Sequence, residues 1–87
     1  MAWVYMLHGS AGRYYIGSTT DLARRLDQHR QGHTYSTRRL GAVLDLAASL
    51  EVPTLPEARR LERELKRKKS PAVALFLLNH PQQLPHG

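Results

Sequence analysis

The sequence predicts a small α/β domain that begins with a β-hairpin and continues with helices. Two segments rich in aromatic and β-branched residues, 3–8 and 13–18, flank a Gly-Ser-Ala-Gly stretch that is typical of a hairpin loop. Two later segments combine helix-start signals with leucines at helical spacing. At 87 residues the chain can form one hydrophobic core but not two. We therefore expect a single domain over residues 1–80, followed by a C-terminal tail over 81–87.

The first helix is expected to begin at Thr20 or Asp21, because either side chain can accept a hydrogen bond from the first turn. It should end near Gly32, since glycine is common just after a helix. The polar stretch 32–41 then reads as a loop. Residues 42–50 are ambiguous, because their alanines and leucines also suit a helix.

Two more helices are predicted in the second half of the chain. Thr54 and Glu57 form a capping box with a proline in the first turn, and the helix should run to about Lys69. Ser70 and a following proline open a short last helix that ends before Pro81. This last helix is apolar all round, so we expect it to be buried.

Composition narrows the possible functions. Thirteen Lys and Arg residues against seven acidic residues give a net charge of +6, which favours polyanionic partners, although an ordinary charge excess would look the same. The absence of cysteine excludes disulfides, thiolate nucleophiles and cysteine zinc sites. The longest apolar run is far too short for a membrane span, and the N-terminus lacks the pattern of a signal peptide. We expect a cytoplasmic protein that does not contact membranes.

Four side chains in the first third of the chain could form a site. Arg25 and His29 are four residues apart and therefore lie on the same side of the helix, next to the buried side formed by its leucines. Such a pair is commonly just part of the solvent-exposed surface of a helix. Tyr5 and Tyr15 should lie on neighbouring strands, where packing is their commoner role. A tyrosine hydroxyl, with a pKa of about 10, becomes a useful base only beside a metal or a guanidinium.

The second predicted helix adds one carboxylate and a cationic surface. Helical phase places Glu62 about 60° from the centre of the buried stripe, while Glu64 faces away. The plainer interpretation of Glu62 is an ion pair with Lys66. Cations dominate the rest of the helix, and contact with nucleic-acid phosphates would relieve their mutual repulsion. The residues that we expect to bind nucleic acid are Arg63, Lys66, Arg67, Lys68 and Lys69.

Together these features resemble the GIY-YIG nuclease family, especially its small stand-alone bacterial members. The strings Trp-Val-Tyr5 and Tyr15-Ile-Gly resemble the two motifs that name the family, with Trp3 in place of the first glycine. The setting of Glu62, between an alanine four residues before it and a lysine four residues after it, is similar to the family's glutamate helix. The resemblance implies a three-stranded antiparallel sheet flanked by helices, in the order β-β-α-β-α-α, with the third strand at 42–50.

The resemblance also implies roles for the candidate residues. Tyr5 and Tyr15 match the motif tyrosines, Arg25 the catalytic arginine, His29 a residue that helps to activate water, and Glu62 the ligand of one Mg²⁺ or Mn²⁺ ion. We expect these five side chains to converge on one shallow concave surface. Weaker candidates are Tyr35, Ser36, Thr37 and Asn79.

The implied function is a metal-dependent endonuclease that hydrolyses DNA phosphodiester bonds. With no separate specificity domain, it would be structure-selective and linked to DNA repair or processing. The alternative is a non-catalytic nucleic-acid-binding module or a subunit of a larger repair complex. DNA, branched or single-stranded, is the expected partner in either case.

Overall fold

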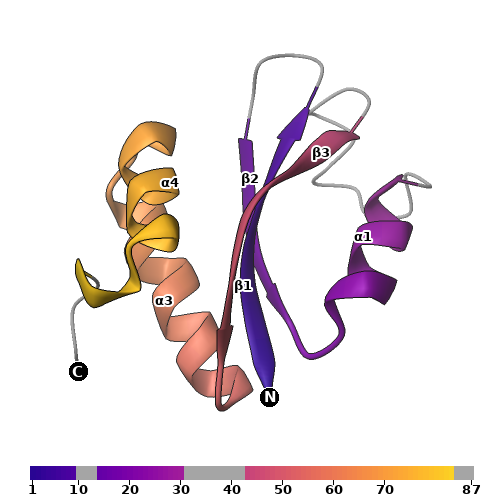
Figure 1. Ribbon diagram of the computed structural model, residues 1–87, viewed down its shortest axis with the longest axis horizontal. Coiled ribbons are helices and arrows are strands. Elements are labelled where there is room, and N and C mark those ends of the chain that lie inside the picture. Colours follow the sequence, from indigo (N-terminus) through magenta and orange to yellow (C-terminus); the bar gives the residue numbers. More distant parts are fainter. Residues whose placement is uncertain (10–13, 31–42, 84–87) are drawn as a thin grey trace.

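A computed structural model describes residues 1–9, 14–30 and 43–83. Its elements confirm the predicted order β-β-α-β-α-α, and the ambiguous third segment is a strand (Figure 1). None of the described helices is long and apolar enough to cross a membrane. The elements are β1 (Ala2–Gly9), β2 (Tyr14–Thr19), α1 (Leu22–Arg30), β3 (Val43–Val52), α3 (Leu55–Arg67), α4 (Pro71–Asn79) and a short 3₁₀ turn (Pro81–Gln83).

The three strands form one antiparallel sheet in the order β2-β1-β3. The first strand of the chain is therefore the central one, and β2 is an edge strand. Tyr5 at the middle of β1 is paired with Gly17 on one side and with Ser49 on the other. Two irregularities in the β1–β3 register, after Met6 and after His8, add local twist to the sheet near its hairpin end.

Helices cover both faces of the sheet, α1 on one side and α3 with α4 on the other (Figure 1). Because side chains alternate along a strand, successive residues of β1 contribute to two different layers. Tyr5 and Leu7 pack with Leu22 and Leu26 of α1. The other layer is the larger core, between the sheet and α3 and α4; its buried members are Ala2, Val4, Met6, Ala48, Val52, Ala58, Leu65, Ala74 and Leu78.

The helix starts are those that the sequence predicts. The Asp21 carboxylate accepts a hydrogen bond from the backbone N–H of Arg24 at 3.1 Å, so Asp21 caps α1. Thr54 Oγ1 accepts from the N–H of Glu57 at 3.4 Å. Ser70 caps α4 in the same way. The predicted end of α1 near Gly32 and the 32–41 loop lie outside the described residues.

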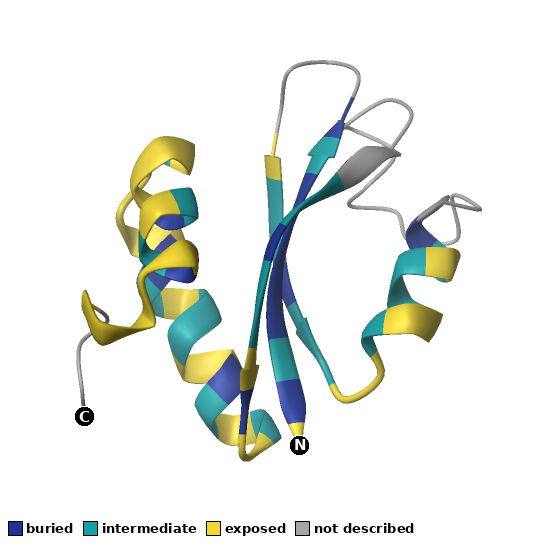
Figure 2. Cartoon of the chain, viewed as in Figure 1, coloured by how far each residue is buried: buried dark blue, intermediate teal, exposed yellow. Residues whose placement is uncertain are grey.

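The prediction that the last helix is buried on all sides is wrong. Ala74 and Leu78 are buried, but Val73 is 42% exposed and Phe76 is 51% exposed. Much of the C-terminal helix is coloured as exposed in Figure 2. The reason is that α4 packs against β3 and α3 with one side only. The outer Phe76 ring instead stacks on His80, with the ring centres 4.2 Å apart.

Candidate active site

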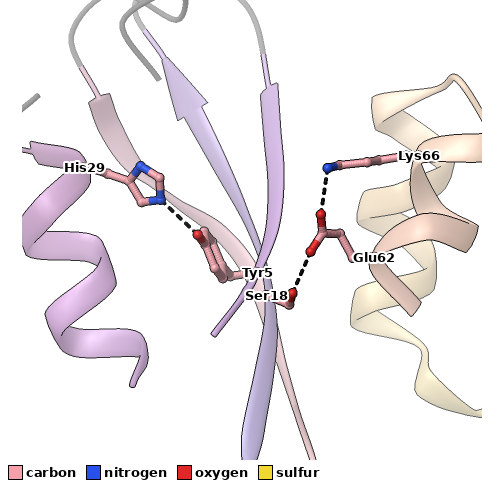
Figure 3. Close-up of polar contacts among 5 residues, drawn as sticks. All are labelled: Tyr5, Ser18, His29, Glu62 and Lys66. Atoms are coloured by element: carbon pink, nitrogen blue, oxygen red, sulfur yellow. Dashed lines mark hydrogen bonds and ion pairs between the residues drawn. The ribbon is translucent and has the colours of Figure 1, made fainter. Parts of the chain in front are cut away.

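The Tyr5 hydroxyl lies at the centre of a compact cluster on the α1 side of the sheet. Its oxygen is 2.8 Å from Nε2 of His29, which extends from the last turns of α1 (Figure 3). Tyr5 is fully buried, and His29 is only 2% exposed. Burial, together with the nearby charge of Arg25, lowers the pKa of His29 to about 4. The imidazole is therefore neutral at pH 7, and the Tyr5 hydroxyl can donate its hydrogen to Nε2.

Tyr15 completes the aromatic part of the cluster. Its ring centre is 6.2 Å from that of Tyr5 and 5.1 Å from that of His29, and the side chain is half-buried. Gly17 makes this close approach possible. A β-carbon at that position would lie 2.6 Å from the Tyr5 hydroxyl oxygen and 2.9 Å from Cε1 of Tyr15. Glycine is thus the residue that leaves room for both rings.

Arg25 brings a positive charge to the two tyrosines. The neighbouring tyrosines, Tyr5 most strongly, raise the pKa of the guanidinium above its usual value. Burial raises the pKa of Tyr5 to about 12 in spite of the nearby guanidinium, so Tyr5 remains a neutral phenol. Arg25 Nη1 donates to Gln28 at 3.3 Å, while its Nε is buried without a partner among the described residues. Arg25 as a whole is only partly buried, so its side chain is not closed off from solvent.

Glu62 does not join this cluster, so the expectation that all five side chains share one surface is wrong, and a catalytic site on a single face of the sheet is contradicted. Its two carboxylate oxygens contact the Ser18 hydroxyl at 2.6 Å and the Lys66 ammonium at 2.6 Å (Figure 3). Ser18 follows Gly17 on β2 and so points to the opposite face of the sheet. The helical phase fixed the position of Glu62 relative to its own helix, but it carried no information on which face that helix covers.

The two sides still interact across β2. The Glu62 carboxylate is among the charges that raise the pKa of Tyr5, although it is the smallest of the causes. Because β2 is an edge strand, no further strand of the described ranges separates the two groups from solvent on that side of the sheet. The tyrosine–arginine cluster and the carboxylate therefore flank one exposed strand.

A cavity of about 530 Å³ opens beside Glu62. Its lining combines one carboxylate and one hydroxyl with two guanidinium groups; the residues are Ser18, Pro56, Arg59, Glu62 and Arg63. Mg²⁺ typically keeps several waters and binds one or two carboxylates together with substrate phosphates. This donor set suits such a hydrated ion. Within the described residues no group of three or more metal-ligating side chains forms a closed cage.

The predicted nucleic-acid-binding residues form an exposed cationic surface on α3 and just beyond it. Lys66 pairs with Glu62, and Arg67 pairs with Glu64 at 3.2 Å. The other three, Arg63, Lys68 and Lys69, make no ion pair within the described part of the chain. Among the weaker candidates, Asn79 is exposed at the end of α4. Tyr35, Ser36 and Thr37 lie outside the described residues.

Two residues of this region were missed as site residues from sequence. Ser18 holds one oxygen of Glu62, and Arg59 lines the cavity with Arg63. The signal for Ser18 was present, since alternation along β2 places it with Ile16 and opposite Tyr15. Arg59 stands three residues before Glu62, one helical turn away, and this spacing was a usable signal as well.

Comparison with known proteins identifies the family of the chain. The GIY-YIG catalytic domain family matches residues 1–75. A UPF0213 protein of Streptococcus pneumoniae serotype 4 is 38% identical over 76 residues, covering 87% of this chain and 77% of the relative. The UPF0213 protein YE0453 of Yersinia enterocolitica is 32% identical over 81 residues, covering 93% of this chain and 84% of the relative.

A solved structure is also similar. The solution NMR structure of the UPF0213 protein BH0048 from Bacillus halodurans shares 38% identity with this chain at a TM-score of 0.50. The match covers 86% of this chain and 85% of that one. On this evidence the chain belongs to the GIY-YIG nuclease superfamily and is a homologue of the small bacterial UPF0213 proteins.

Proposed function

We propose that the chain is a metal-dependent endonuclease that hydrolyses DNA phosphodiester bonds, selects DNA by structure and acts in repair or processing. The observation that carries the proposal is the placement of two complementary groups about the edge strand β2. Arg25 and two tyrosine hydroxyls lie on one side, and Glu62 with its cavity lies on the other. A phosphodiester lying along this edge would be near both.

On the α1 side, Arg25 stabilises negative charge that develops on the phosphoryl oxygens, since its guanidinium is always protonated and the residue is only partly buried. Tyr5 does not act as the base, because a phenol with a pKa of about 12 keeps its proton at neutral pH. Its hydroxyl donates a hydrogen bond to Nε2 of the neutral His29 and keeps the proton, while the positive charge of Arg25 lies nearby. Tyr15, the more exposed tyrosine, orients the attacking water.

On the α3 side, Glu62 and Ser18 would hold one Mg²⁺ or Mn²⁺ ion, with Arg59 and Arg63 available to phosphate oxygens. When bound, the ion supplies a Lewis acid that polarises the scissile phosphate and stabilises the leaving oxygen. The residues themselves position the phosphate between two arginines and the carboxylate.

DNA binding by this surface is expected to be electrostatic. Neutralising about four phosphates gives a slope near −3 to −4 in a plot of log affinity against log salt concentration. Replacing both Arg63 and Lys68 by alanine should make the slope less negative by about 2, whatever the base sequence, because phosphate contacts carry no base information. Replacing Arg24 on the distant helix α1 is the control, and we expect it to change the slope less.

A cleavage assay tests the proposal. Linear, nicked, flap and branched DNAs are incubated with the protein and Mg²⁺, Mn²⁺ or EDTA, together with the Glu62→Gln and Glu64→Gln variants. We expect metal-dependent product, loss of product in EDTA and in Glu62→Gln, and normal product in Glu64→Gln, because Glu64 pairs with Arg67 away from the cavity.

A second candidate function follows from one contact. Both oxygens of Glu62 already have protein partners, Ser18 and Lys66, which is also what a non-catalytic nucleic-acid-binding module would show. Salt-sensitive DNA binding without metal-dependent product from any substrate of the panel would select this alternative and contradict the nuclease proposal.

A further inference from the structure

A second hollow lies between α3 and β2, next to the cavity at Glu62. It measures about 260 Å³, and its lining residues are Met6, Tyr14, Ile16, Leu65, Lys66, Lys69, Ser70 and Pro71. The two hollows are lined by neighbouring residues of the same two elements. Ser18 of β2 and Glu62 of α3 line the first hollow, and Ile16 of β2 and Lys66 of α3 line the second. Glu62 lines the first hollow and Lys66 lines the second, so the ion pair between them, drawn in Figure 3, stands at their border.

The lining of this second hollow has an apolar floor and a cationic rim. Met6 and Leu65 are buried core residues, and Ile16 packs against them. The Tyr14 ring is 38% exposed, and His8 stacks on it at 4.9 Å with an angle of 27°, which steadies the ring. An aromatic ring above apolar side chains, next to lysines, is the combination with which proteins bind single-stranded nucleic acid.

The backbone at Lys69 gives a second, independent indication. Lys69 has φ of 54°, and no other non-glycine residue of the described ranges has a positive φ. It follows the α3 cap, Lys68, and its N–H closes the helix end by donating to the Lys66 carbonyl at 3.2 Å. Glycine is the favoured residue at such a position, because a side chain strains this backbone. A strained residue at the rim of a hollow points to a functional use of its side chain.

We propose that this hollow is a subsite for one unpaired nucleobase of a single-stranded stretch of nucleic acid. The base would lie against Tyr14 on the apolar floor, with its flanking phosphates at Lys69 and at the arginines of the neighbouring cavity. At about 260 Å³ the hollow is smaller than most drug-sized ligand pockets, which span roughly 300–1,000 Å³, and it admits a single flat ring rather than a duplex. The inference rests on the proposed function and deepens it, because it selects DNA with unpaired nucleotides beside the cut.

The test compares two ligands of equal length and charge. An oligothymidylate and an abasic oligonucleotide carry the same phosphates, and only the first carries bases. Affinities are measured for the whole chain in EDTA, without cleavage. We expect wild-type protein to bind the oligothymidylate about tenfold more tightly, a preference that Tyr14→Phe keeps and Tyr14→Ala removes. Equal affinity of the wild-type protein for both ligands, or an unchanged preference in Tyr14→Ala, would overturn the subsite.

Lys69 offers a variant in which instability does not explain a loss of binding. Lys69→Gly should unfold at an equal or higher urea concentration than wild type, because it relieves the strained backbone. It should nevertheless weaken oligothymidylate binding more than Lys68→Ala, which removes an equal charge outside the hollow. Equal losses in the two variants would count against a role for Lys69.

This test is separate from that of the proposed function. A base preference without metal-dependent cleavage would contradict the nuclease proposal and retain the subsite as a binding site. Metal-dependent cleavage without base preference would contradict the subsite alone.

Discussion

The two faces of the sheet build their functional groups in opposite ways. On the α1 side, Tyr5 and His29 are buried and joined by a direct hydrogen bond, so packing fixes their geometry. On the α3 side, Glu62 stands beside exposed arginines and an open cavity, so charge and solvent govern the arrangement. We infer that a change on the α1 side lowers stability together with function, whereas a change among the exposed charged residues of the α3 side mainly affects function.

The largest expected effect is on cleavage. Arg25→Ala should lower the cleavage rate about 100- to 1,000-fold, the range found when a preorganised donor to a developing negative charge is removed. Arg24→Ala is the matched control, because Arg24 neighbours Arg25 on the same helix but is exposed. Rates are measured by single-turnover gel assays. Equal rates for Arg25→Ala and wild type would remove Arg25 from the mechanism.

Acid should destabilise the α1 side through His29. Its pKa is about 4 in the folded protein and has the ordinary value of 6.5 in the unfolded chain, so the unfolded state binds more protons between these values. The stabilisation is fully present above pH 6.5 and is lost as the pH falls towards 4, by at most about 3 kcal/mol. Urea unfolding between pH 4.5 and 7.5 measures it. We expect His29→Gln to show a shallower pH dependence than wild type, and parallel curves would exclude His29 as the cause.

Substitutions at two neighbouring residues of β2, Gly17 and Ser18, allow the stability of the two faces of the sheet to be compared directly. Gly17→Ala should lower the free energy of unfolding by about 1–3 kcal/mol, since its methyl group would overlap the rings of Tyr5 and Tyr15. Ser18→Ala loses the hydrogen bond to Glu62 on the open face and should cost about 1 kcal/mol or less. Thermal unfolding of both variants shows which of the two substitutions destabilises the protein more. A larger loss in Ser18→Ala would reverse our comparison of the faces.

The smallest expected effect concerns competition at Glu62. Lys66 occupies one carboxylate oxygen, so a divalent ion must displace its ammonium group. Lys66→Met should therefore tighten Mn²⁺ binding about two- to fivefold, because partly exposed ion pairs are worth about 0.2–1 kcal/mol. Arg67→Met removes an equal charge that pairs with Glu64 instead. Calorimetric titration distinguishes them, and equal tightening in both variants would show that only the net charge matters.

Local signals in the sequence were sufficient for most of the fold. The caps at Asp21 and Thr54 and the antiparallel pairing of β1 with β2 depend on residues close in sequence, and the structure has each of them. The third strand needed the family resemblance, because alanine and leucine suit a helix equally well. The exposed side of α4 was not predictable, since apolar composition does not reveal how many neighbours a helix finds.

The sequence was sufficient to predict which site residues lie together on one side of the sheet, but not how the two sides are arranged relative to each other. Arg25 and His29 share a helix face by their spacing, and the structure brings both to Tyr5. The side of the sheet on which Glu62 lies depends on how the chain crosses over between β3 and α3, which no local pattern encodes. The hydrogen bond between Ser18 and Glu62 forms because this connection places α3 on the Ser18 side of the sheet.

The central position of β1 has a consequence for how the chain folds. Ala2 pairs with Val52, so the strand that carries Tyr5 finds its second neighbour only after β3 (Val43–Val52) has been made. Until then β1 and β2 form a two-stranded hairpin, which is marginally stable on its own, and the unpaired N–H and C=O groups along one edge of the apolar strand β1 are open to pairing with other chains. Contacts between residues so far apart in sequence slow folding. The newly made protein therefore passes through an aggregation-prone stage that ends when β3 docks.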